Sequence, residues 1–149
     1  MSKRVATDDN YDRDFYAWAN HQAALLRAGK VAEADLAHIA EEIDSMGRAE
    51  KREMVSRLTV LLLHLLKWRF QPNLRSRNWR LRVAEQRILV TSHLTDNPSL
   101  KSLTASAIAD AYRVALLVAQ RETGLDAGVF PSNCPWSFDH IADDAFWPD

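Results

Sequence analysis

The most continuous helical pattern in the chain runs from Glu50 to Phe70, a stretch without glycine or proline. Its apolar residues recur at steps of three and four: Met54, Leu58, Leu61, Leu62, Leu65 and Trp68. This spacing places them on one face of an α-helix, and Pro72 disfavours its continuation. Downstream of Thr59 polar residues become rare, which is typical of a helix buried on most sides. We therefore predict a central helix against which the other helices pack.

A second helical pattern leads into this run from about Ala32. Its apolar stripe consists of Leu36, Ile39, Ala40, Ile43 and Met46. Gly47 then interrupts the pattern, at a cost of about 1 kcal/mol relative to alanine in a helix. Two interpretations stay open: one helix continues through Gly47 to Phe70, with a bend or a close contact there, or Gly47 ends the first of two helices. The good helix formers on both sides favour the continuous helix.

Three further helices are predicted, over about 11–28, 78–94 and 98–123. Asp9, Asn10 or Asp12 is the expected N-cap of the first helix, and Ser76 or Asn78 that of the second. Gly29 and Gly124 are expected as helix stops. Trp79, Val83, Ile88 and Val90 are the expected apolar members of the 78–94 helix.

The two ends of the chain differ in character. Residues 1–10 are polar, and we expect a flexible N-terminus. Residues 125–149 hold too many prolines for a long helix and too many apolar residues for a free tail, so we expect an irregular C-terminal wrap. One short helix is predicted near 137–143, capped by Ser137. The predicted fold is all-α: an up-and-down helical bundle of four main helices, with a long central helix.

Length and composition narrow the class of protein. At 149 residues we predict a single domain, 1–149. The lone Cys134 excludes an internal disulfide and a multi-cysteine zinc site, and favours a reducing, cytoplasmic environment. The N-terminus lacks the apolar core of a signal peptide, and Val60–Leu63 is far shorter than the roughly 20 apolar residues that span a bilayer. We expect no membrane association, no cofactor and no bound metal.

His64 is the first candidate for chemistry, because it is the one polar group inside the apolar run. A metal or acid–base role would need partners from other helices, such as His38 with Glu41 and Glu42, or His93. The Glu-x-x-His spacing of di-metal bundles does not occur. A buried, hydrogen-bonded structural histidine is the favoured interpretation, and the three residues His64, Glu41 and Glu42 stay weak catalytic candidates.

Glu41 and Glu42 have a simpler interpretation as well. Adjacent residues point about 100° apart on a helix, so these two carboxylates cannot share one small site by themselves. Glu41, Ser45 and Arg48 lie on one face, which predicts a salt bridge across Gly47. Cys134 has no adjacent catalytic partner, with His140 nearest in sequence, so an inert thiol is favoured over a nucleophile.

A basic elbow, Lys67 to Arg87, is the third candidate. Its basic residues are Lys67, Arg69, Arg75, Arg77, Arg80, Arg82 and Arg87, with Glu85 the only acid and Trp68, Phe70 and Trp79 interleaved. Basic groups beside aromatic rings suit a phosphate backbone with stacked bases, and Arg75, Arg77, Arg80 and Arg82 would form that surface. No nucleic-acid-binding motif accompanies them. The acidic residues after Arg121 offer a partner within the chain, so we favour a C-terminal wrap that lies against the basic elbow.

Four blocks of the sequence stand out together: DFYAWANHQAALLRAG, DLAHIAEEIDSMGRAEKREMVSRLTVLLLHLLKW, FQPNLRSRNWR and CPWSFDHIADDAFWPD. In order and spacing they resemble the bacterial family called domain of unknown function 29, and the resemblance covers about Tyr11 to Pro148. It implies a small, almost entirely helical bundle and an unassigned biochemical role, so it transfers no catalytic residue. The family's motif positions correspond here to Glu41, Glu42, Gly47, His64, Trp68, Gln71, Pro72 and Trp79.

The leading hypothesis for function is a non-enzymatic helical interaction module. A protein partner or a homodimer is expected, the latter through the 33–50 half of the central helix. The alternatives are nucleic-acid or phosphate binding through Lys67–Arg87, and a metal- or acid–base-dependent enzyme around His64.

Overall fold

The computed structural model of the chain describes residues 10–149 and confirms the all-α fold class. The described residues contain no strand. Contacts divide the chain into two compact units, Met1–Ala49 and Glu50–Asp149. The long helix α3 (Leu36–Phe70) contributes residues to both units. The single domain stays a prediction.

Unit 1 begins with two short helices where one was predicted. Helices α1 (Asn10–Arg13) and α2 (Phe15–Arg27) are separated at Asp14. The Asp14 backbone leaves the helical region, at φ −148° and ψ 81°, and its carboxylate accepts a hydrogen bond from the Ala17 N–H at 3.0 Å. The N-cap of the longer helix is therefore Asp14 and not Asn10 or Asp12, while Asp9 lies outside the described residues. Gly29, at φ +74°, follows the helix as predicted.

Helix α3 runs without interruption through Gly47, which decides between the two interpretations of the sequence. It begins at Leu36 and not near Ala32, because Val31–Glu33 form a 3-10 turn. Asp35 acts as its N-cap: the carboxylate accepts from the His38 N–H at 3.4 Å, and the carbonyl accepts from the Ile39 N–H at 3.0 Å.

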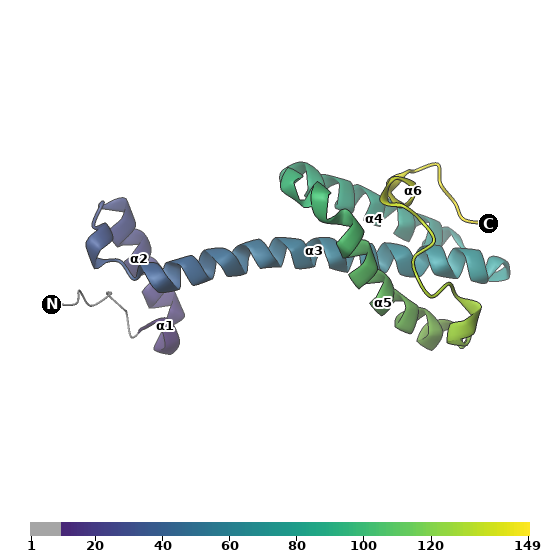
Figure 1. Cartoon of the computed structure of the whole chain (residues 1–149), viewed down its shortest axis with the longest axis horizontal. Coiled ribbons are helices and arrows are strands. Elements are labelled where there is room, and N and C mark those ends of the chain that lie inside the picture. Colours follow the sequence, from purple (N-terminus) through teal and green to yellow (C-terminus); the bar gives the residue numbers. More distant parts are fainter. Residues whose placement is uncertain (1–9) are drawn as a thin grey trace. The chain divides into compact units, whose positions relative to one another are not determined.

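Unit 2 contains the rest of α3 together with α4 (Arg77–Asp96), α5 (Thr104–Thr123) and α6 (Phe138–Ala142). Both α4 and α5 pack against α3 (Figure 1), and α6 contacts α4 and α5. Three 3-10 segments, Pro72–Leu74, Pro98–Leu103 and Ala127–Val129, connect these elements. The predicted caps Ser76 and Ser137 accept from backbone N–H groups at 3.2 and 3.3 Å, and Gly124 ends α5 at φ +73°.

The core of unit 2 is the apolar face of α3 that the spacing predicted. Of the predicted stripe, Met54, Leu58, Leu61, Leu62 and Leu65 are fully buried and Trp68 is 7 % exposed; Leu66, outside the stripe, is fully buried as well. Helix α5 faces them with a row of fully buried alanines: Ala107, Ala111, Ala115 and Ala119. The prediction for α4 was partly wrong, since Ile88 is 65 % exposed while Gln86 and Arg87 are buried.

Within the described residues, Pro98–Thr123 is the one helical stretch long and apolar enough to cross a bilayer by length and composition. Its alanine face packs into the core of unit 2, and a core helix gives the same signal. The absence of membrane association stays a prediction.

Candidate functional site

His64 lies half-buried on α3 in unit 2, with one nitrogen already engaged. Its Nδ1 donates to the Val60 carbonyl at 2.8 Å, so the neutral ring presents Nε2 as an acceptor. Burial lowers the pKa of His64, and the nearby Lys67 and Arg82 act in the same direction. The ring therefore favours the neutral form, as a structural histidine on an apolar helix does.

Glu41 and Glu42 lie in unit 1, whereas His64 belongs to unit 2. Glu42 accepts a hydrogen bond from the Tyr11 hydroxyl, and this bond is the largest cause of the raised Tyr11 pKa, about 12. Glu41 lies 3.6 Å from Arg48, which also donates to Ser45 at 3.1 Å. The salt bridge predicted across Gly47 is confirmed and lies within α3, whereas Glu42 joins α3 to α1 through Tyr11.

A hydrogen-bonded network around Asp35, which the sequence did not indicate, joins the elements of unit 1. The buried Asp35 carboxylate accepts from Trp18 Nε1 at 3.0 Å and from His38 Nδ1 at 2.7 Å. Its backbone N–H donates to the buried Gln22 side chain at 2.7 Å. The Tyr11 ring stacks on His38 with centroids 3.9 Å apart. The one sequence signal was the position of Asp35 directly before a helical run.

The first part of α3 leaves one face open. Leu36, Ile43 and Met46 are 47 %, 60 % and 65 % exposed, and Ala40 and Gly47 beside them are exposed as well. The residues of this segment that contact α1 are on another face, at His38 and Glu42. Gly47 has ordinary helical geometry, and no neighbouring atom of the described residues lies within 4 Å of the position that a Cβ would occupy there. The stripe that the sequence showed is therefore an unpartnered apolar surface within the described residues of unit 1.

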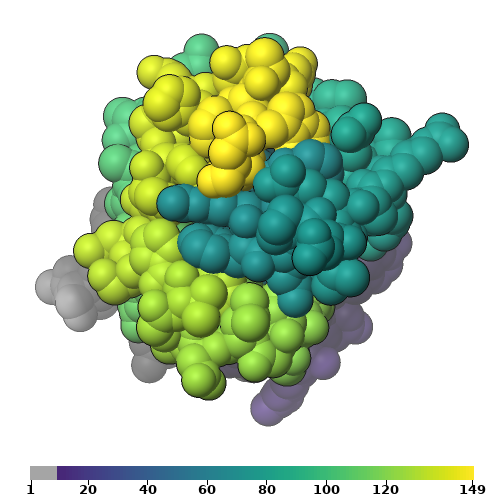
Figure 2. Space-filling view, turned by 90° about the vertical axis from the view of Figure 1, so that its right-hand side faces the viewer, coloured from purple at the N-terminus to yellow at the C-terminus, as the bar shows by residue number. Residues whose placement is uncertain are grey.

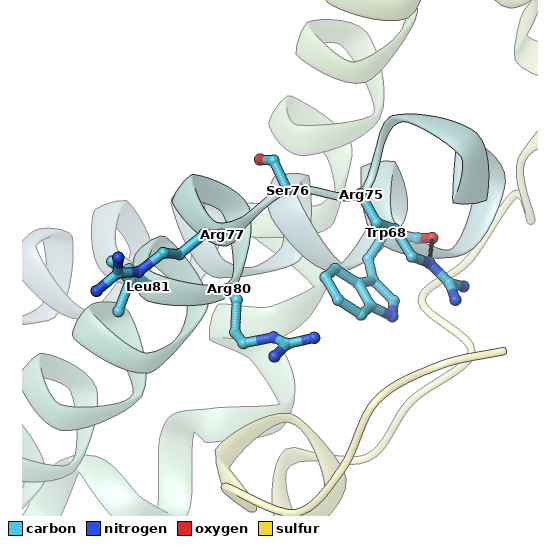
Figure 3. Close-up of a pocket in the computed structure, with 6 residues that line it drawn as sticks. All are labelled: Trp68, Arg75, Ser76, Arg77, Arg80 and Leu81. Carbon is cyan, nitrogen blue, oxygen red and sulfur yellow. Dashed lines mark hydrogen bonds between the residues drawn. The ribbon is translucent and has the colours of Figure 1, made fainter.

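The basic elbow contains a hollow of about 410 Å³ lined by Trp68, Arg75, Ser76, Arg77, Arg80 and Leu81. Figure 3 shows the guanidinium groups of Arg75 and Arg80 to either side of the Trp68 indole, with Arg77 directed away from it. The guanidinium carbons of Arg75 and Arg80 lie 4.8 and 5.6 Å from the indole centroid. Arg75 also donates through Nε to the Trp68 carbonyl at 2.8 Å. Two cations are thus held around one aromatic ring.

Arg77, Arg80 and Arg82 form no ion pair with any residue in the range 10–149. Lys67, by contrast, pairs with Glu122 on α5, and this contact lowers the pKa of Glu122. The basic elbow therefore has two parts: cations used inside the fold and arginines left to solvent on α4.

The C-terminal wrap lies against the basic elbow, as predicted, but through its backbone. Figure 2 shows the C-terminal residues, in yellow, against the teal residues of the elbow. Arg87 is only 2 % exposed and donates to the carbonyls of Ile141, Asp144 and Phe146 at 2.9, 3.4 and 2.6 Å. Burial lowers the pKa of Arg87, and the carboxylates of Asp144 and Asp143 act in the opposite direction. The predicted pairing of acidic with basic side chains is thus largely replaced by carbonyl contacts, because a buried guanidinium with its five donors needs several acceptors.

The aromatic rings of the basic elbow already have neighbours. Trp68 is buried and contacts Trp147, with centroids 4.5 Å apart. Phe70 packs edge-on against Phe130, and Lys67 lies over the Trp79 ring. Stacked bases would need free ring faces, so the geometry favours phosphate contacts over base stacking at this surface.

A second hollow, of about 300 Å³, lies between α5 and the wrap and is lined in part by Tyr112, Arg113, Asn133 and Cys134. The Tyr112 hydroxyl donates to the Pro131 carbonyl, and burial raises the Tyr112 pKa to about 12. Burial also raises the pKa of the Cys134 thiol, which donates to the Trp136 carbonyl at 3.5 Å. This arrangement favours the protonated thiol, the less reactive form.

Among the residues that the structure describes, no three His, Cys, Asp or Glu side chains gather as a metal site would require.

Comparison with protein families gives one match. The family model described as Domain of unknown function DUF29 matches residues 10–147. A comparison with curated proteins and another with solved structures return no match.

Proposed function

We propose a function from the geometry of this chain, which belongs to the family described as Domain of unknown function DUF29. It is a non-enzymatic interaction module that binds another helix through the open face of α3 in unit 1. The observation that carries the proposal is Gly47, an exposed glycine within a long helix whose Cβ position has no close neighbour among residues 10–149.

A glycine in the interior of an exposed helix costs about 1 kcal/mol relative to alanine. Within a fold, that cost is commonly offset by a neighbour that packs directly on the helix backbone. Within the part of the chain that the structure describes, no such neighbour lies within 4 Å of the Cβ position at Gly47. We therefore propose that the neighbour is another molecule, which packs closely on this part of the helix.

The side chains around Gly47 fit this role. Leu36, Ile43 and Met46 present large apolar groups to solvent over about three turns of α3. Apolar groups that cluster on a surface commonly mark protein interaction sites. Helices bind one another through apolar residues at such three- and four-residue steps.

A photoreactive amino acid at Ala40, at the centre of the open face, tests this function. We expect irradiation in cells to give a crosslinked species of one defined mass. The matched control places the same group at the exposed Thr91 on α4, where we expect no defined product. The absence of any defined product at Ala40 would refute the proposal.

A second candidate function is the binding of phosphate groups at the hollow of the basic elbow. Its support is the pair of guanidinium groups around Trp68, within 6 Å of one ring centroid, with no carboxylate partner among the described residues. These like charges lie within about the 10 Å Debye length of 0.1 M salt, so an anion bound in the hollow beside them would relieve their repulsion. Nucleic-acid phosphates are one source of such anions and small phosphorylated molecules another.

Titration with a labelled single-stranded oligonucleotide and with inorganic triphosphate separates these sources. We expect Arg75→Gln and Arg80→Gln together to weaken binding, and Arg113→Gln on α5 to leave it unchanged. The affinity should fall steeply with salt because counterions are released. Lack of binding to either ligand at 50 mM salt, or equal binding by an acidic peptide, would remove this candidate.

A further inference from the structure

The order of large and small side chains on the open face of α3 indicates which partner fits it. Four exposed residues, Leu36, Ala40, Ile43 and Gly47, follow one another at steps of four, three and four. This is the spacing of a seam between two packed helices. Along the seam the side chains alternate in size: large, small, large, small.

We infer that the partner is a second copy of this chain, with its α3 antiparallel to the first; the inference rests on the function proposed above. A twofold axis between residues 41 and 42 reverses the order of the seam in the second copy. Leu36 then lies opposite Gly47 of the other copy, and Ile43 lies opposite Ala40. Each large side chain meets a small one at every level of the contact.

A parallel pair does not fit the same residues. It would place Leu36 against Leu36 and Gly47 against Gly47, with crowding at one end and a void at the other. Close-packed interfaces avoid both. In the antiparallel pair the two helix dipoles also point in opposite directions, which is the favourable arrangement. A self-complementary patch of this kind is what a twofold homodimer requires, because both copies contribute the same surface.

The charges of this segment are compatible with the pair. None of the four seam residues is charged. Glu41 and Arg48 are joined to each other on the same chain at 3.6 Å, and the helical repeat places both away from the seam. Tyr11 and His38 stack on another face of α3 from the seam, so α1 does not cover it.

Sedimentation velocity over a range of concentrations tests the stoichiometry. We expect a species of twice the 17.0 kDa of the chain, in reversible exchange with the monomer. Ile43→Glu should weaken the dimer by about 30-fold or more, since it buries a charge at the centre of the seam. Ile88→Glu is the matched control, because Ile88 on α4 is exposed to a similar degree, 65 % against 60 %. Equal dimerisation by Ile43→Glu and wild type would overturn the inference.

Gly47→Ala separates a contact between chains from an effect within one chain. In the monomer the added methyl group meets open space, and alanine is the better helix former, so the melting temperature of dilute protein should rise. In the dimer the methyl group would displace Leu36 of the other copy, and we expect the dimer to weaken by about tenfold. Gly128→Ala, at another open glycine, should leave dimerisation unchanged. A Gly47→Ala protein that dimerises as tightly as wild type would count against the seam.

Spin labels report the orientation of the two helices. Glu41→Cys and Arg48→Cys, each in a Cys134→Ser background, place labels on the same side of α3. In the antiparallel pair the two labels at position 48 are offset by about 20 Å along the axis, and those at position 41 by about 2 Å, from a rise of 1.5 Å per residue. The measured distance should therefore be longer at 48 than at 41. Equal distances at both positions would indicate a parallel pair and overturn the inference.

Different results would exclude the homodimer and the interaction module. A protein that stays monomeric at 100-fold above its cellular concentration, but crosslinks through Ala40 to a product of another mass, would retain the interaction module and exclude the second copy. A monomer without any defined crosslink would exclude both.

Discussion

The contact of Arg87 with the C-terminal wrap allows a quantitative prediction for Arg87→Met. This substitution keeps most of the apolar stem and removes every donor. Hydrogen bonds to charged groups contribute about 1.5–3 kcal/mol each, and a buried acceptor left without a donor costs about 1–3 kcal/mol. Of the three carbonyls that Arg87 binds, that of Ile141 belongs to a fully buried residue, while Asp144 is exposed and Phe146 half-buried.

We count the loss of one full charged hydrogen bond at the Ile141 carbonyl and smaller losses of free energy at the other two carbonyls, which water can reach. The expected decrease in the free energy of unfolding is then about 3–5 kcal/mol. Domains of this size have a total stability of only about 5–15 kcal/mol. The variant should therefore fold, but with a wrap that is released more readily than the helices.

Urea unfolding measured by two signals tests this. Circular dichroism follows the helices. Tryptophan fluorescence arises from all five tryptophans, and it should respond to release of the wrap through Trp147, whose ring contacts Arg87 and Trp68. Arg82→Met is the control, since Arg82 is an exposed residue of the same helix, and we expect a change within about 0.5 kcal/mol. A decrease below about 1 kcal/mol in Arg87→Met, with unchanged fluorescence, would refute the assigned role of the three carbonyl contacts.

Three further outcomes are expected. Because burial lowers the folded-state pKa of His64 below its usual value near 6.5, the unfolded chain binds more protons as pH falls through 6.5. The free energy of unfolding should therefore decrease below about pH 6.5, and His64 should contribute at most about 1.4 kcal/mol per pH unit. His64→Gln should flatten this part of the curve of unfolding free energy against pH. An unchanged curve would contradict the lowered pKa of His64. Asp35→Ala should destabilise unit 1 by about 2–4 kcal/mol, because Trp18 and His38 lose their hydrogen-bond acceptor and α3 loses its N-cap. Hydrogen exchange should show a loss of amide protection in α2 but not in α5. Tyr112→Phe should lower the free energy of unfolding by about 1 kcal/mol, measured by urea unfolding, because the Pro131 carbonyl loses its donor, and a neutral effect would mean that water replaces it.

The features that local rules govern were predictable from the sequence. Ser76 and Ser137 cap their helices, and Gly29 and Gly124 adopt positive φ, because each of these roles depends on a few neighbouring residues. The main buried face of α3 followed from spacing, since the helical repeat places Met54, Leu58, Leu61 and Leu65 together.

Features that depend on distant residues were not predictable in the same way. Arg87 is buried because residues more than 50 positions later supply its acceptors, although its place between Val83 and Val90 on the buried side of α4 was a hint. Asp14 divides the first predicted helix because several residues within one turn are able to act as N-cap. The pattern of apolar residues does not show which of them does. The Asp35 network joins Trp18 and Gln22 of α2 to Asp35 and His38 at the start of α3, and no local spacing rule relates these two elements.

The row of buried alanines on α5 limits which side-chain sizes the fold accepts at these positions. Where Ala107, Ala111, Ala115 and Ala119 are fully buried, the separation between α5 and its neighbours is set by main-chain atoms and single methyl groups. A valine at any of these positions would have to push a whole helix outward, and a glycine would weaken the helix itself by about 1 kcal/mol. Substitution is therefore restricted in both directions, and this helix should be the segment of unit 2 whose composition drifts least among functional variants.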